Sequence, residues 1–404
     1  MKKLVALILG ILLLGGSMAM AEFANEDWYA EAMKASVITG NNVRLKKVID
    51  RARSGENITI ATVGGSITEG AAASTYAECW ASRFAVMFGN TFGTGNNVEL
   101  INSGVGGTPS PFGWMRYGKD VLERVSEKDA DGLPDLVIIE YAVNDWEECT
   151  KGRAYESMVK EILSAENQPA VMLMFTVRRD GWNLQDDLQK IGDRYNLPMV
   201  SIRDGIYPHL DKDYPKSDWY SDDYHPKSVG HRMMADALME AVKEADAAEA
   251  DAADIDLTVE PVKGTDFMGL KTIYGEGETE GVTVERGSFK SIDVNSYRNT
   301  PVGWVCGKNF HHNITDGDEP LKITGVFRKC LIAWKASAES SFGTAEVLLD
   351  GVVKKTLSGG NGKWGQSEVV LVLDAKEASE RTIEIRMADG NKGRKFTITA
   401  ISVQ

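Results

Sequence analysis

The chain has 404 residues, of which 43% are hydrophobic and 26% are charged. This length and balance are typical of a soluble globular protein with one domain of ordinary size and a second, smaller one, and they exclude a largely disordered chain. Acidic residues outnumber basic residues by 59 to 45, which gives a net charge of −14. Because such a charge repels phosphate backbones, we expect no nucleic-acid partner.

The first 21 residues have the pattern of an export signal. Lys2 and Lys3 precede an apolar stretch at 4–14, and Ala19-Met20-Ala21 matches the A-x-A cleavage pattern. We therefore expect a secreted protein that is cleaved after Ala21 and is then no longer held at the membrane. An uncleaved anchor is the alternative. No cysteine follows the apolar stretch, so we expect no lipid attachment.

Short apolar runs then alternate with stretches of helical period. In the helical stretches, such as 80–88 and 155–163, apolar residues stand three or four positions apart. Continuous apolar runs predict strands that are buried on both faces, and their alternation with helices predicts a parallel, doubly wound α/β sheet. The runs cover residues 58–63, 98–101, 136–141, 170–177 and 199–202.

The pattern changes near residue 255, after an acidic, alanine-rich stretch at 244–254. Beyond it, apolar residues recur at every second position, as in 382–387 and 396–401, and Asp350-Gly351 separates two apolar runs as a two-residue hairpin turn does. These features predict an antiparallel β-sandwich. The expected organisation is a signal peptide at 1–21, an α/β domain at 22–250, a linker at 251–262 and the β-sandwich at 263–404.

Four cysteines are too few for a fold that is built on disulfides. Cys79 and Cys149 fall in the first predicted domain, and Cys306 and Cys330 fall in the second. One bridge in each domain and free thiols are both compatible with this distribution.

A first block of chemistry-bearing residues, Gly64-Gly65-Ser66-Ile67-Thr68-Glu69-Gly70, follows the first predicted strand. Its glycines permit a sharp turn that exposes the Ser66 hydroxyl at the carboxyl edge of the sheet, where open α/β sheets bind ligands. The alternative is a capping box, in which Ser66 and Glu69 satisfy N–H groups at a helix start.

Two further blocks follow the next two strands. Gly104, Gly106 and Gly107 lie in a glycine-rich turn after the second strand, where backbone N–H groups can approach a substrate closely. Asn144, in Ala142-Val143-Asn144-Asp145, ends the third strand and is expected at the same sheet edge as Ser66. Taken singly, each of these segments is also an ordinary turn.

The fourth block, Asp222-Asp223-Tyr224-His225-Pro226, places a carboxylate and an imidazole three residues apart. One local turn brings the Asp222 carboxylate to the His225 ring. His225 can then accept the proton of Ser66, while Asp222 holds the ring in the required tautomer. A solvated acidic loop with a structural histidine is the alternative for this block alone.

The four blocks, in this order, resemble the SGNH hydrolase superfamily, also called GDSL-type esterases. The resemblance covers about residues 55–245 and implies a flavodoxin-like, three-layer α/β/α fold. It also implies that Ser66 is the nucleophile, with Asp222 and His225 as its catalytic partners. Ser66, Gly107 and Asn144 would donate the N–H groups of the oxyanion hole, Gly107 being preferred because it stands five residues after Asn102. The first block reads Gly-Gly-Ser-Ile where the family has Gly-Asp-Ser-Leu, and Ala142 stands where glycine is usual.

The complete arrangement is similar to two-domain bacterial carbohydrate O-acetylesterases that act on acetylated mannan, in which the β-sandwich is like a carbohydrate-binding module. Aromatic residues beside the blocks fit this resemblance, because aromatic faces bind sugars, although packing in the core is the alternative for each. The tryptophans expected to bind substrate are Trp146, Trp182, Trp219 and Trp364, with Trp304 as a further candidate.

The expected function is that of a secreted carbohydrate esterase that removes acetyl groups from plant cell-wall glycans, most of all mannan or its oligosaccharides. A xylan acetylesterase, another GDSL-type esterase or lipase, and a non-catalytic glycan-binding protein are the alternatives. Serine catalysis needs no cofactor or metal. Asp316, Asp318 and Glu319 are expected to form an acidic turn, for which a structural calcium site in the β-sandwich is the alternative. The expected partner is an acetylated glycan, and the oligomeric state is left open.

Overall fold

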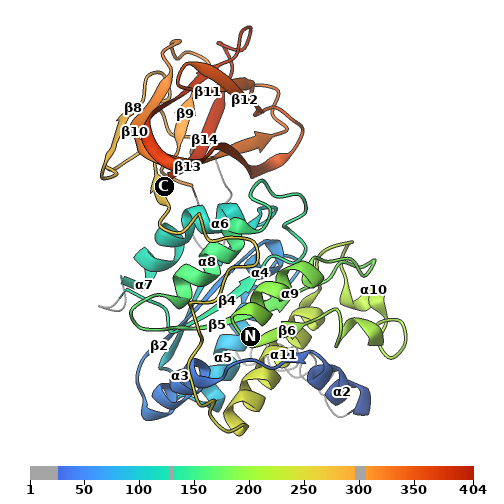
Figure 1. Ribbon diagram of the computed structural model, residues 1–404. Helices are drawn as coiled ribbons and strands as arrows, with labels where there is room; N and C mark the ends of the chain where they lie inside the picture. Colours follow the sequence, from blue (N-terminus) through green and yellow to red (C-terminus); the bar gives the residue numbers. More distant parts are fainter. Residues whose placement is uncertain (1–25, 127–131, 296–305) are drawn as a thin grey trace, which may run out of the picture.

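The computed structural model describes residues 26–126, 132–295 and 306–404 (Figure 1). The predicted export signal and Trp304 lie outside these residues. Two domains follow one another along the chain, an α/β domain and then an all-β domain (Figure 1). In the part of the chain that is described, no helix is both long and apolar enough to cross a membrane.

The first domain is built on a six-stranded sheet in the order β1-β6-β5-β4-β2-β3. The last five of these strands run parallel, and β1 pairs antiparallel with β6 at one edge. This order of parallel strands is that of a flavodoxin-like, doubly wound sheet, as the sequence predicts. The strands are β1 (Val37–Ile38), β2 (Ile58–Gly64), β3 (Val98–Gly104), β4 (Leu136–Glu140), β5 (Ala170–Phe175) and β6 (Met199–Ser201).

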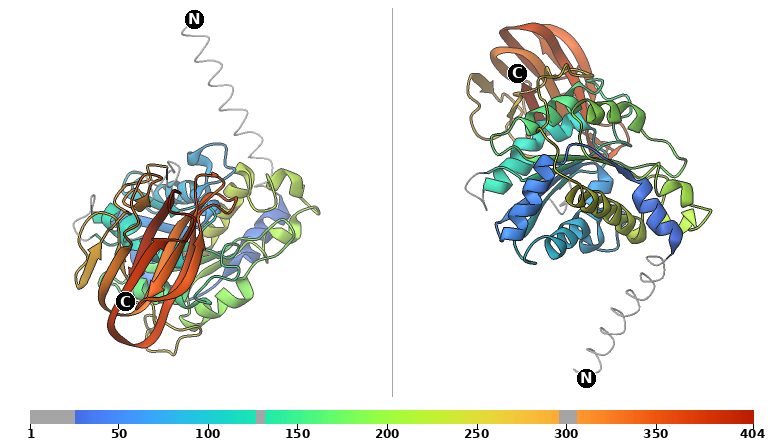
Figure 2. Two further views of the ribbon diagram at one scale, coloured as in Figure 1. Left: turned by 90° about the horizontal axis from the view of Figure 1, so that it is seen from above. Right: turned by 60° about the horizontal axis from the view of Figure 1, so that its bottom comes forward.

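Helices cover both faces of this sheet, which makes three layers (Figure 2). Because β2, β4 and β5 are buried along their whole length, they appear in the sequence as continuous apolar runs. One face packs against α2 (Asp27–Ala35), α3 (Val43–Ser54), α5 (Trp80–Thr91) and α11 (Ser228–Ala247). The other packs against α6 (Ser110–Tyr117), α8 (Arg153–Leu163) and α9 (Gln185–Arg194). Shorter helices are α4 (Ser66–Glu69), η1 (Tyr76–Glu78), η2 (Gly118–Leu122), α7 (Glu123–Ser126), η3 (Tyr207–His209) and α10 (Lys216–Trp219).

The second domain is an eight-stranded antiparallel sheet around its own apolar core. Its longest strands are interrupted by register shifts, one of them between Phe327 and Lys329, so that β10 pairs with β8 near its start and with β14 near its end. Asp350 and Gly351 have φ of 52° and 78° and form the predicted two-residue hairpin turn. The strands are β7 (Lys271–Ile273), β8 (Val282–Glu285), β9 (Phe310–His312), β10 (Leu321–Ser337), β11 (Thr344–Leu349), β12 (Val352–Ser358), β13 (Trp364–Met387) and β14 (Phe396–Val403).

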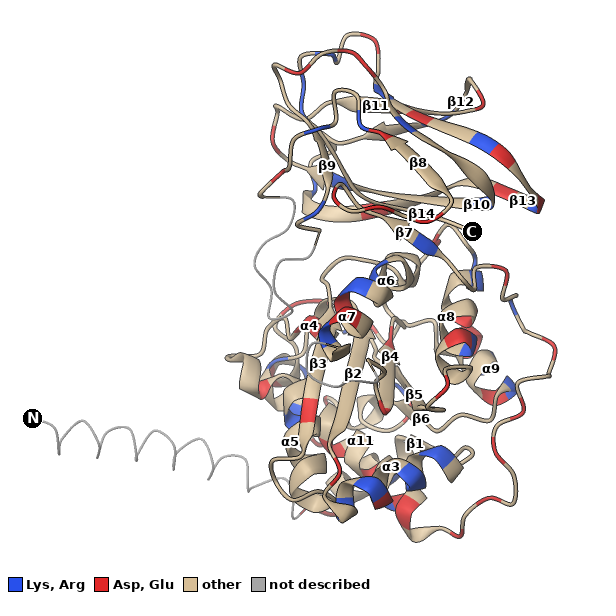
Figure 3. Cartoon of the chain, turned by 90° about the vertical axis from the view of Figure 1, so that its left-hand side faces the viewer, with Lys and Arg blue, Asp and Glu red and all other residues tan. Residues whose placement is uncertain are grey.

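The two domains share an apolar interface. Leu331, Ala333 and Ala400 of the second domain belong to the same buried cluster as α6 and α8 of the first. In Figure 3 the strands β7, β10 and β14 lie above these helices. At the margin of this interface, Arg153 pairs with Asp266 and Asp374, each at 2.8 Å. The second domain is therefore fixed on the first by both apolar and charged contacts.

The segment between α11 and β7, which contains the predicted linker at 251–262, is packed against the first domain. Arg44 pairs with Asp254 at 2.9 Å. The buried Glu156 carboxylate accepts the backbone N–H groups of Val262, at 2.7 Å, and Gly264, at 2.9 Å. This part of the chain is thus held along its length rather than free.

All four cysteines are free thiols, and Cys79 and Cys330 are buried. Burial raises the pKa of the Cys149 and Cys306 thiols to about 12, so both remain protonated at neutral pH. Of the two alternatives that the sequence leaves open, the structure has the free thiols.

Candidate active site

A tight turn between β2 and α4 presents Ser66 at the carboxyl edge of the sheet. Neighbouring atoms leave no room for a side chain at the two glycines of this turn. A Cβ on Gly64 would stand 2.1 Å from Thr68 Oγ1, and a Cβ on Gly65 would stand 2.2 Å from Asn144 Oδ1. Because residues 64 and 65 are glycines, the turn that carries Ser66 can pack directly against Thr68 and the Asn144 side chain.

Ser66, His225 and Asp222 form a continuous hydrogen-bonded chain. Ser66 Oγ lies 2.8 Å from His225 Nε2, and His225 Nδ1 lies 2.7 Å from Asp222 Oδ2. With the ring proton on Nδ1, the imidazole donates to Asp222 and leaves Nε2 to accept the Ser66 hydroxyl. The structure thus brings together the three residues that the sequence predicts to be catalytic. Ser66 and His225 are 159 positions apart in the sequence.

Asp222 is held as a carboxylate by its own loop. Its Oδ1 accepts the backbone N–H groups of Tyr224 and His225, each at 2.8 Å. Partial burial raises the pKa of Asp222, but the hydrogen bonds from the His225 ring and from these N–H groups outweigh it, and the pKa stays below its ordinary value. An ionised Asp222 is suited to stabilise a protonated His225 ring.

The candidate oxyanion donors lie on two further loops that contact the segment carrying Ser66. The Asn144 side chain lies directly against Gly65, since a Cβ added to this glycine would stand 2.2 Å from the Asn144 Oδ1. Gly107 lies on the loop after β3 with φ of 69°, a conformation that favours glycine. Of the competing glycines, Gly104 donates its N–H to Asn102 and Gly106 donates its N–H to Glu69. This favours Gly107 as the donor from this loop.

Glu69 does not complete a capping box. The N-cap of α4 is Gly65, whose carbonyl accepts the Glu69 N–H at 3.0 Å, and the Ser66 hydroxyl is engaged by His225. The Glu69 carboxylate accepts the N–H of Gly106 at 2.7 Å. The Ser66-x-x-Glu69 spacing therefore serves a contact between two loops of the site rather than the start of its own helix.

Glu140 is a buried carboxyl beneath the site that the sequence analysis does not predict. Glu140, at the end of β4, accepts hydrogen bonds from the hydroxyls of Thr68 at 2.9 Å and Thr176 at 2.6 Å. Burial raises its pKa, against these hydrogen bonds and one from the Gly65 N–H. A signal for this residue was present, because an acidic residue inside the apolar run 136–141 needs buried hydrogen-bond partners.

A cluster of aromatic side chains is connected to His225 through the neighbouring Tyr224, whose ring centroid lies 6.2 Å from that of His225. Trp146 is 62% exposed and meets Trp182 edge to face, with ring centroids 5.1 Å apart. The Arg178 guanidinium lies 5.6 Å from the Trp182 ring and 4.7 Å from the Tyr224 ring, and Tyr224 adjoins His225. Trp146, Trp182, Arg178 and Tyr224 are called the aromatic wall below. The sequence patterns do not single out Arg178 or Tyr224.

The prediction that Trp219 binds substrate is wrong. Trp219 is 1% exposed and packs edge to face on Tyr220, with ring centroids 4.4 Å apart. Its ring also fills the space beside Gly230, where an added Cβ would approach it to 2.8 Å. A side chain enclosed in this way cannot contact a sugar, so Trp219 belongs to the core.

Trp364 reaches the site from the second domain. It is 54% exposed at the start of β13. A Cβ on Gly107 would stand 2.9 Å from Trp364 Cζ2 and 3.4 Å from Gln366 Oε1. Both domains therefore border the space beside Gly107, and Gln366 is a further neighbour that the sequence does not nominate.

The acidic turn that contains Asp318 and Glu319 directs its carboxylates to different partners. Asp318 pairs with Lys392 at 2.8 Å, and Glu319 accepts the Ser288 hydroxyl at 2.7 Å. Over residues 26–126, 132–295 and 306–404, no group of three or more histidine, cysteine or acidic side chains is arranged to hold a metal ion.

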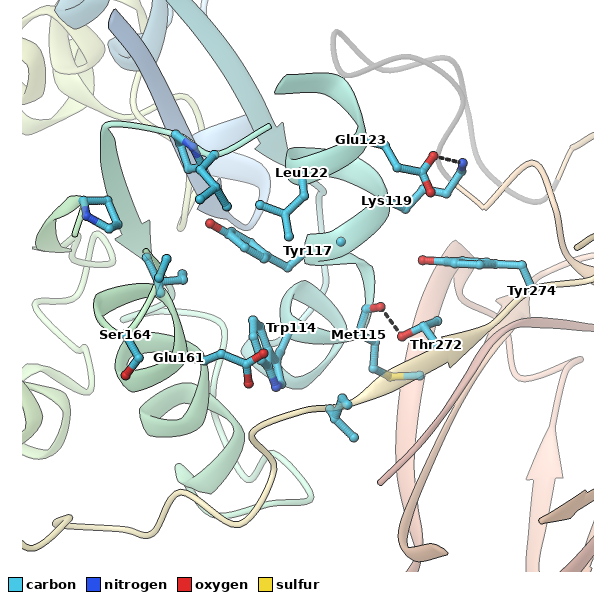
Figure 4. A pocket seen from close by; sticks show the side chains of 17 residues that line it. Trp114, Met115, Tyr117, Lys119, Leu122, Glu123, Glu161, Ser164, Thr272 and Tyr274 are labelled. Atoms are coloured by element: carbon cyan, nitrogen blue, oxygen red, sulfur yellow. Dashed lines mark hydrogen bonds and ion pairs between the residues drawn. The ribbon is translucent and has the colours of Figure 1, made fainter. Parts of the chain in front are cut away.

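A separate cavity of about 480 Å³ lies between α6, α8 and the start of the second domain (Figure 4). Trp114, Tyr117 and Tyr274 line it, and the Thr272 hydroxyl donates to the Met115 carbonyl at 2.5 Å at its edge. No member of the Ser66–His225–Asp222 chain lines this cavity. It belongs to the junction of the domains rather than to the candidate active site.

Comparison with known proteins supports the same assignment. Residues 62–233 match the model of the GDSL-like Lipase/Acylhydrolase family. No curated protein sequence matches the chain. The chain is similar to the crystal structure of a two-domain esterase (CEX) active on acetylated mannans, with a TM-score of 0.77 and 26% identity over 92% of this chain and 97% of that chain.

A structure of a two-domain esterase (CEX) active on acetylated mannans and co-crystallized with mannopentaose gives the same TM-score and coverage at 25% identity. Both similarities extend over the α/β domain and the β domain. The predicted order of an α/β hydrolase domain followed by an antiparallel β domain is thereby confirmed.

Proposed function

For this chain, a carboxylic ester hydrolase with a domain of the GDSL-like lipase/acylhydrolase family, we propose that the substrate is O-acetylated mannan or manno-oligosaccharide. The observation that carries the chemistry is the Ser66–His225–Asp222 hydrogen-bonded chain, with spacings of 2.8 and 2.7 Å. The support for the substrate comes from the likeness to an esterase active on acetylated mannans and from the aromatic wall beside the site.

In the proposed reaction, Ser66 Oγ attacks the carbonyl carbon of the acetyl ester while His225 Nε2 accepts its proton. Asp222 keeps the proton on His225 Nδ1 and stabilises the imidazolium that forms. The negative charge on the carbonyl oxygen is held by the N–H groups of Ser66 and Gly107 and by the Asn144 amide.

The second half of the reaction uses the same groups. His225 gives its proton to the departing sugar hydroxyl, which leaves the acetyl group on Ser66. A water molecule then enters, loses a proton to His225 and attacks the acetyl carbonyl, and acetate departs as Ser66 regains its proton. No further reactant is required.

The walls of the site favour a short acyl group on a sugar. Trp364 and Gln366 stand close over Gly107, which restricts the room for a long acyl chain on this side. The exposed face of Trp146 offers a flat apolar surface to a sugar ring. We expect Trp146, Trp182 and Trp364 to contact the glycan, and the second domain to act as a wall of the cleft.

A substrate panel tests the proposal. Acetate release is measured from acetylated mannan, acetylated xylan, a small acetyl ester and esters of longer acids. Fastest release from mannan supports the proposal, whereas fastest release from xylan keeps the chemistry and replaces the substrate. A rate that rises with acyl length indicates a lipase, and glycan binding without hydrolysis of any ester indicates a binding protein.

We also propose that the chain is exported and cleaved after Ala21. The support is the basic, apolar and Ala-Met-Ala succession at 1–21. N-terminal sequencing of the protein recovered outside the producing cell is expected to begin at Glu22. A protein that stays inside the cell with Met1 intact would contradict this.

A further inference from the structure

The loop that carries Gly107 is held at both ends by buried carboxyl groups. Before Gly107, the N–H of Gly106 donates to Glu69 Oε2 at 2.7 Å. After it, the N–H of Ser110 donates to Asp145 Oδ1, also at 2.7 Å. The Glu69 and Asp145 residues are only 6% and 7% exposed. Two positions that bracket Gly107 are thus fixed by side chains from elsewhere in the fold.

Each of these carboxyls comes from a segment that bears another oxyanion donor. Glu69 is the last residue of α4, whose first residue is Ser66. Asp145 directly follows Asn144. The two hydrogen bonds therefore join the Gly107 loop to the Ser66 segment on one side and to the Asn144 segment on the other.

Both carboxyls are buried where they reach the Gly107 loop. The Glu69 carboxylate reaches out of its own helix to the neighbouring loop, while its backbone N–H donates to the Gly65 carbonyl at 3.0 Å. Asp145 buries a carboxyl whose Oδ2 has no hydrogen-bond partner among the described residues. Burying such groups is unfavourable unless their contacts compensate. The hydrogen bonds from Gly106 to Glu69 and from Ser110 to Asp145 contribute to this compensation.

We propose that Glu69 and Asp145 are positioning residues that fix the Gly107 N–H relative to Ser66 and Asn144, so that the three oxyanion donors converge before the substrate binds. This inference rests on the proposed function, because it concerns the oxyanion hole of that same site. Such preorganisation contributes to the rate only if the donors stay in place while negative charge develops on the substrate.

The environment of Asp145 agrees with this role. Burial, with Glu148 nearby, raises the pKa of Asp145 to about 8. At neutral pH the group is then uncharged, so it accepts the Ser110 N–H without adding a negative charge close to a developing oxyanion. Asparagine offers the same acceptor oxygen, which makes Asp145→Asn a conservative replacement, as Glu69→Gln is for Glu69.

The test compares kcat and KM of the full chain on a small acetyl ester for Glu69→Ala, Asp145→Ala, Glu69→Gln and Asp145→Asn. We expect the alanine variants to lose about 10- to 100-fold in kcat with KM within about threefold, since misplacing a donor costs no more than removing it. The Gln and Asn variants are expected to stay within about threefold of the parent kcat. Alanine variants with the parent kcat, or conservative variants as slow as the alanine ones, would overturn the proposal.

Glu156→Ala is the matched control. Glu156 is also buried and also accepts backbone N–H groups, those of Val262 and Gly264, but it lies outside the active site. We expect it to lower the melting temperature and to leave kcat unchanged. A loss of kcat in Glu156→Ala equal to that in the alanine variants would show a general effect of destabilisation and would contradict the proposal.

A binding ratio separates positioning from folding. A boronic acid that forms a tetrahedral adduct with Ser66 requires the oxyanion donors, whereas mannopentaose does not. We expect Glu69→Ala and Asp145→Ala to weaken boronate binding about tenfold or more and to leave mannopentaose binding unchanged. Equal weakening of both ligands would contradict the proposal. If the alanine variants do not fold, Ser110→Pro removes the donated N–H instead, because proline is favoured at the first position of a helix.

Failure of the proposed function gives a different result. In that case the parent chain itself neither hydrolyses acetyl esters nor binds the boronate. Failure of the positioning role alone leaves the parent active and the alanine variants equally active.

Discussion

Trp364 of the β domain lies against Gly107 of the α/β domain, so close that a Cβ on Gly107 would stand 2.9 Å from the indole Cζ2. The contact joins residues that are far apart in the sequence and belong to different domains. It rests on a shared apolar interface, which includes Leu331 and Ala333. The candidate active site therefore depends on how the two domains are joined, and not on the α/β domain alone.

Replacing Trp364 should affect glycan substrates selectively. For Trp364→Ala we expect KM on acetylated manno-oligosaccharides to rise about tenfold, equivalent to about 1.4 kcal/mol, because the sugar loses an apolar face. The rate on a small acetyl ester should change little. Steady-state kinetics on both substrates checks this, with Lys363→Ala from the same loop as the control. Equal losses on the two substrates would show that Trp364 supports the oxyanion loop rather than the sugar.

Gly65→Ala should disable the site without unfolding the protein. The added methyl group would stand 2.2 Å from Asn144 Oδ1, so the amide must move away from Ser66. We expect kcat to fall about 10²-fold, the size of the loss of one oxyanion donor. Gly118→Ala is the control, because a Cβ there meets nothing within 4 Å. Full activity of Gly65→Ala would mean that the Asn144 amide is not needed where it lies.

Asn144→Ala removes the same amide donor directly. We expect kcat to fall about 10²- to 10³-fold while the melting transition is retained. Activity and thermal unfolding are measured on one preparation. Near-normal turnover by the folded variant would remove Asn144 from the oxyanion hole.

The charged contact between the domains should make stability depend on pH in the acid range. Hydrogen bonds from Arg153 and Lys329 lower the pKa of Asp374 to about 2. Since this pKa lies below that of an unfolded aspartate, about 3.9, the contribution is complete above that value and is lost as the pH falls toward 2.

We therefore expect Asp374→Asn to lower the free energy of unfolding at pH 7 by about 1 kcal/mol or less, because Asp374 is 40% exposed and its charges are screened. The difference from the parent should shrink between pH 4 and pH 2. Thermal unfolding over this range measures it. A difference that grows as the pH falls would contradict the assigned sign.

The sequence is sufficient for the fold class and for the Ser66–His225–Asp222 chain, because a parallel sheet brings the carboxyl ends of its strands to one edge. Ser66 and Asn144 each follow a recognisable buried strand, so the order of the strands along the chain is enough to predict that they lie close together. The Asp222–His225 contact is local, and one turn is enough to form it.

Contacts that depend on packing between distant segments could not be predicted. The sequence predicts that both Trp182 and Trp219 bind substrate, yet Trp219 is buried against Gly230, whereas Trp182 contacts the exposed Trp146. The Glu69 spacing fits a capping box equally well, and only the position of the Gly106 N–H decides which partner it takes. The Trp364–Gly107 contact depends on how the two domains are oriented, and the sequence pattern does not indicate that orientation.

The most direct test of the account is acetate release by the parent chain and by Ser66→Ala, measured in one assay on a small acetyl ester and on acetylated manno-oligosaccharide, with the melting transition of both proteins recorded. We predict that the parent releases acetate from both substrates and that Ser66→Ala, still folded, loses at least about 10³-fold on each. Acetate release by Ser66→Ala at the rate of the parent would contradict the assignment of Ser66 as the nucleophile.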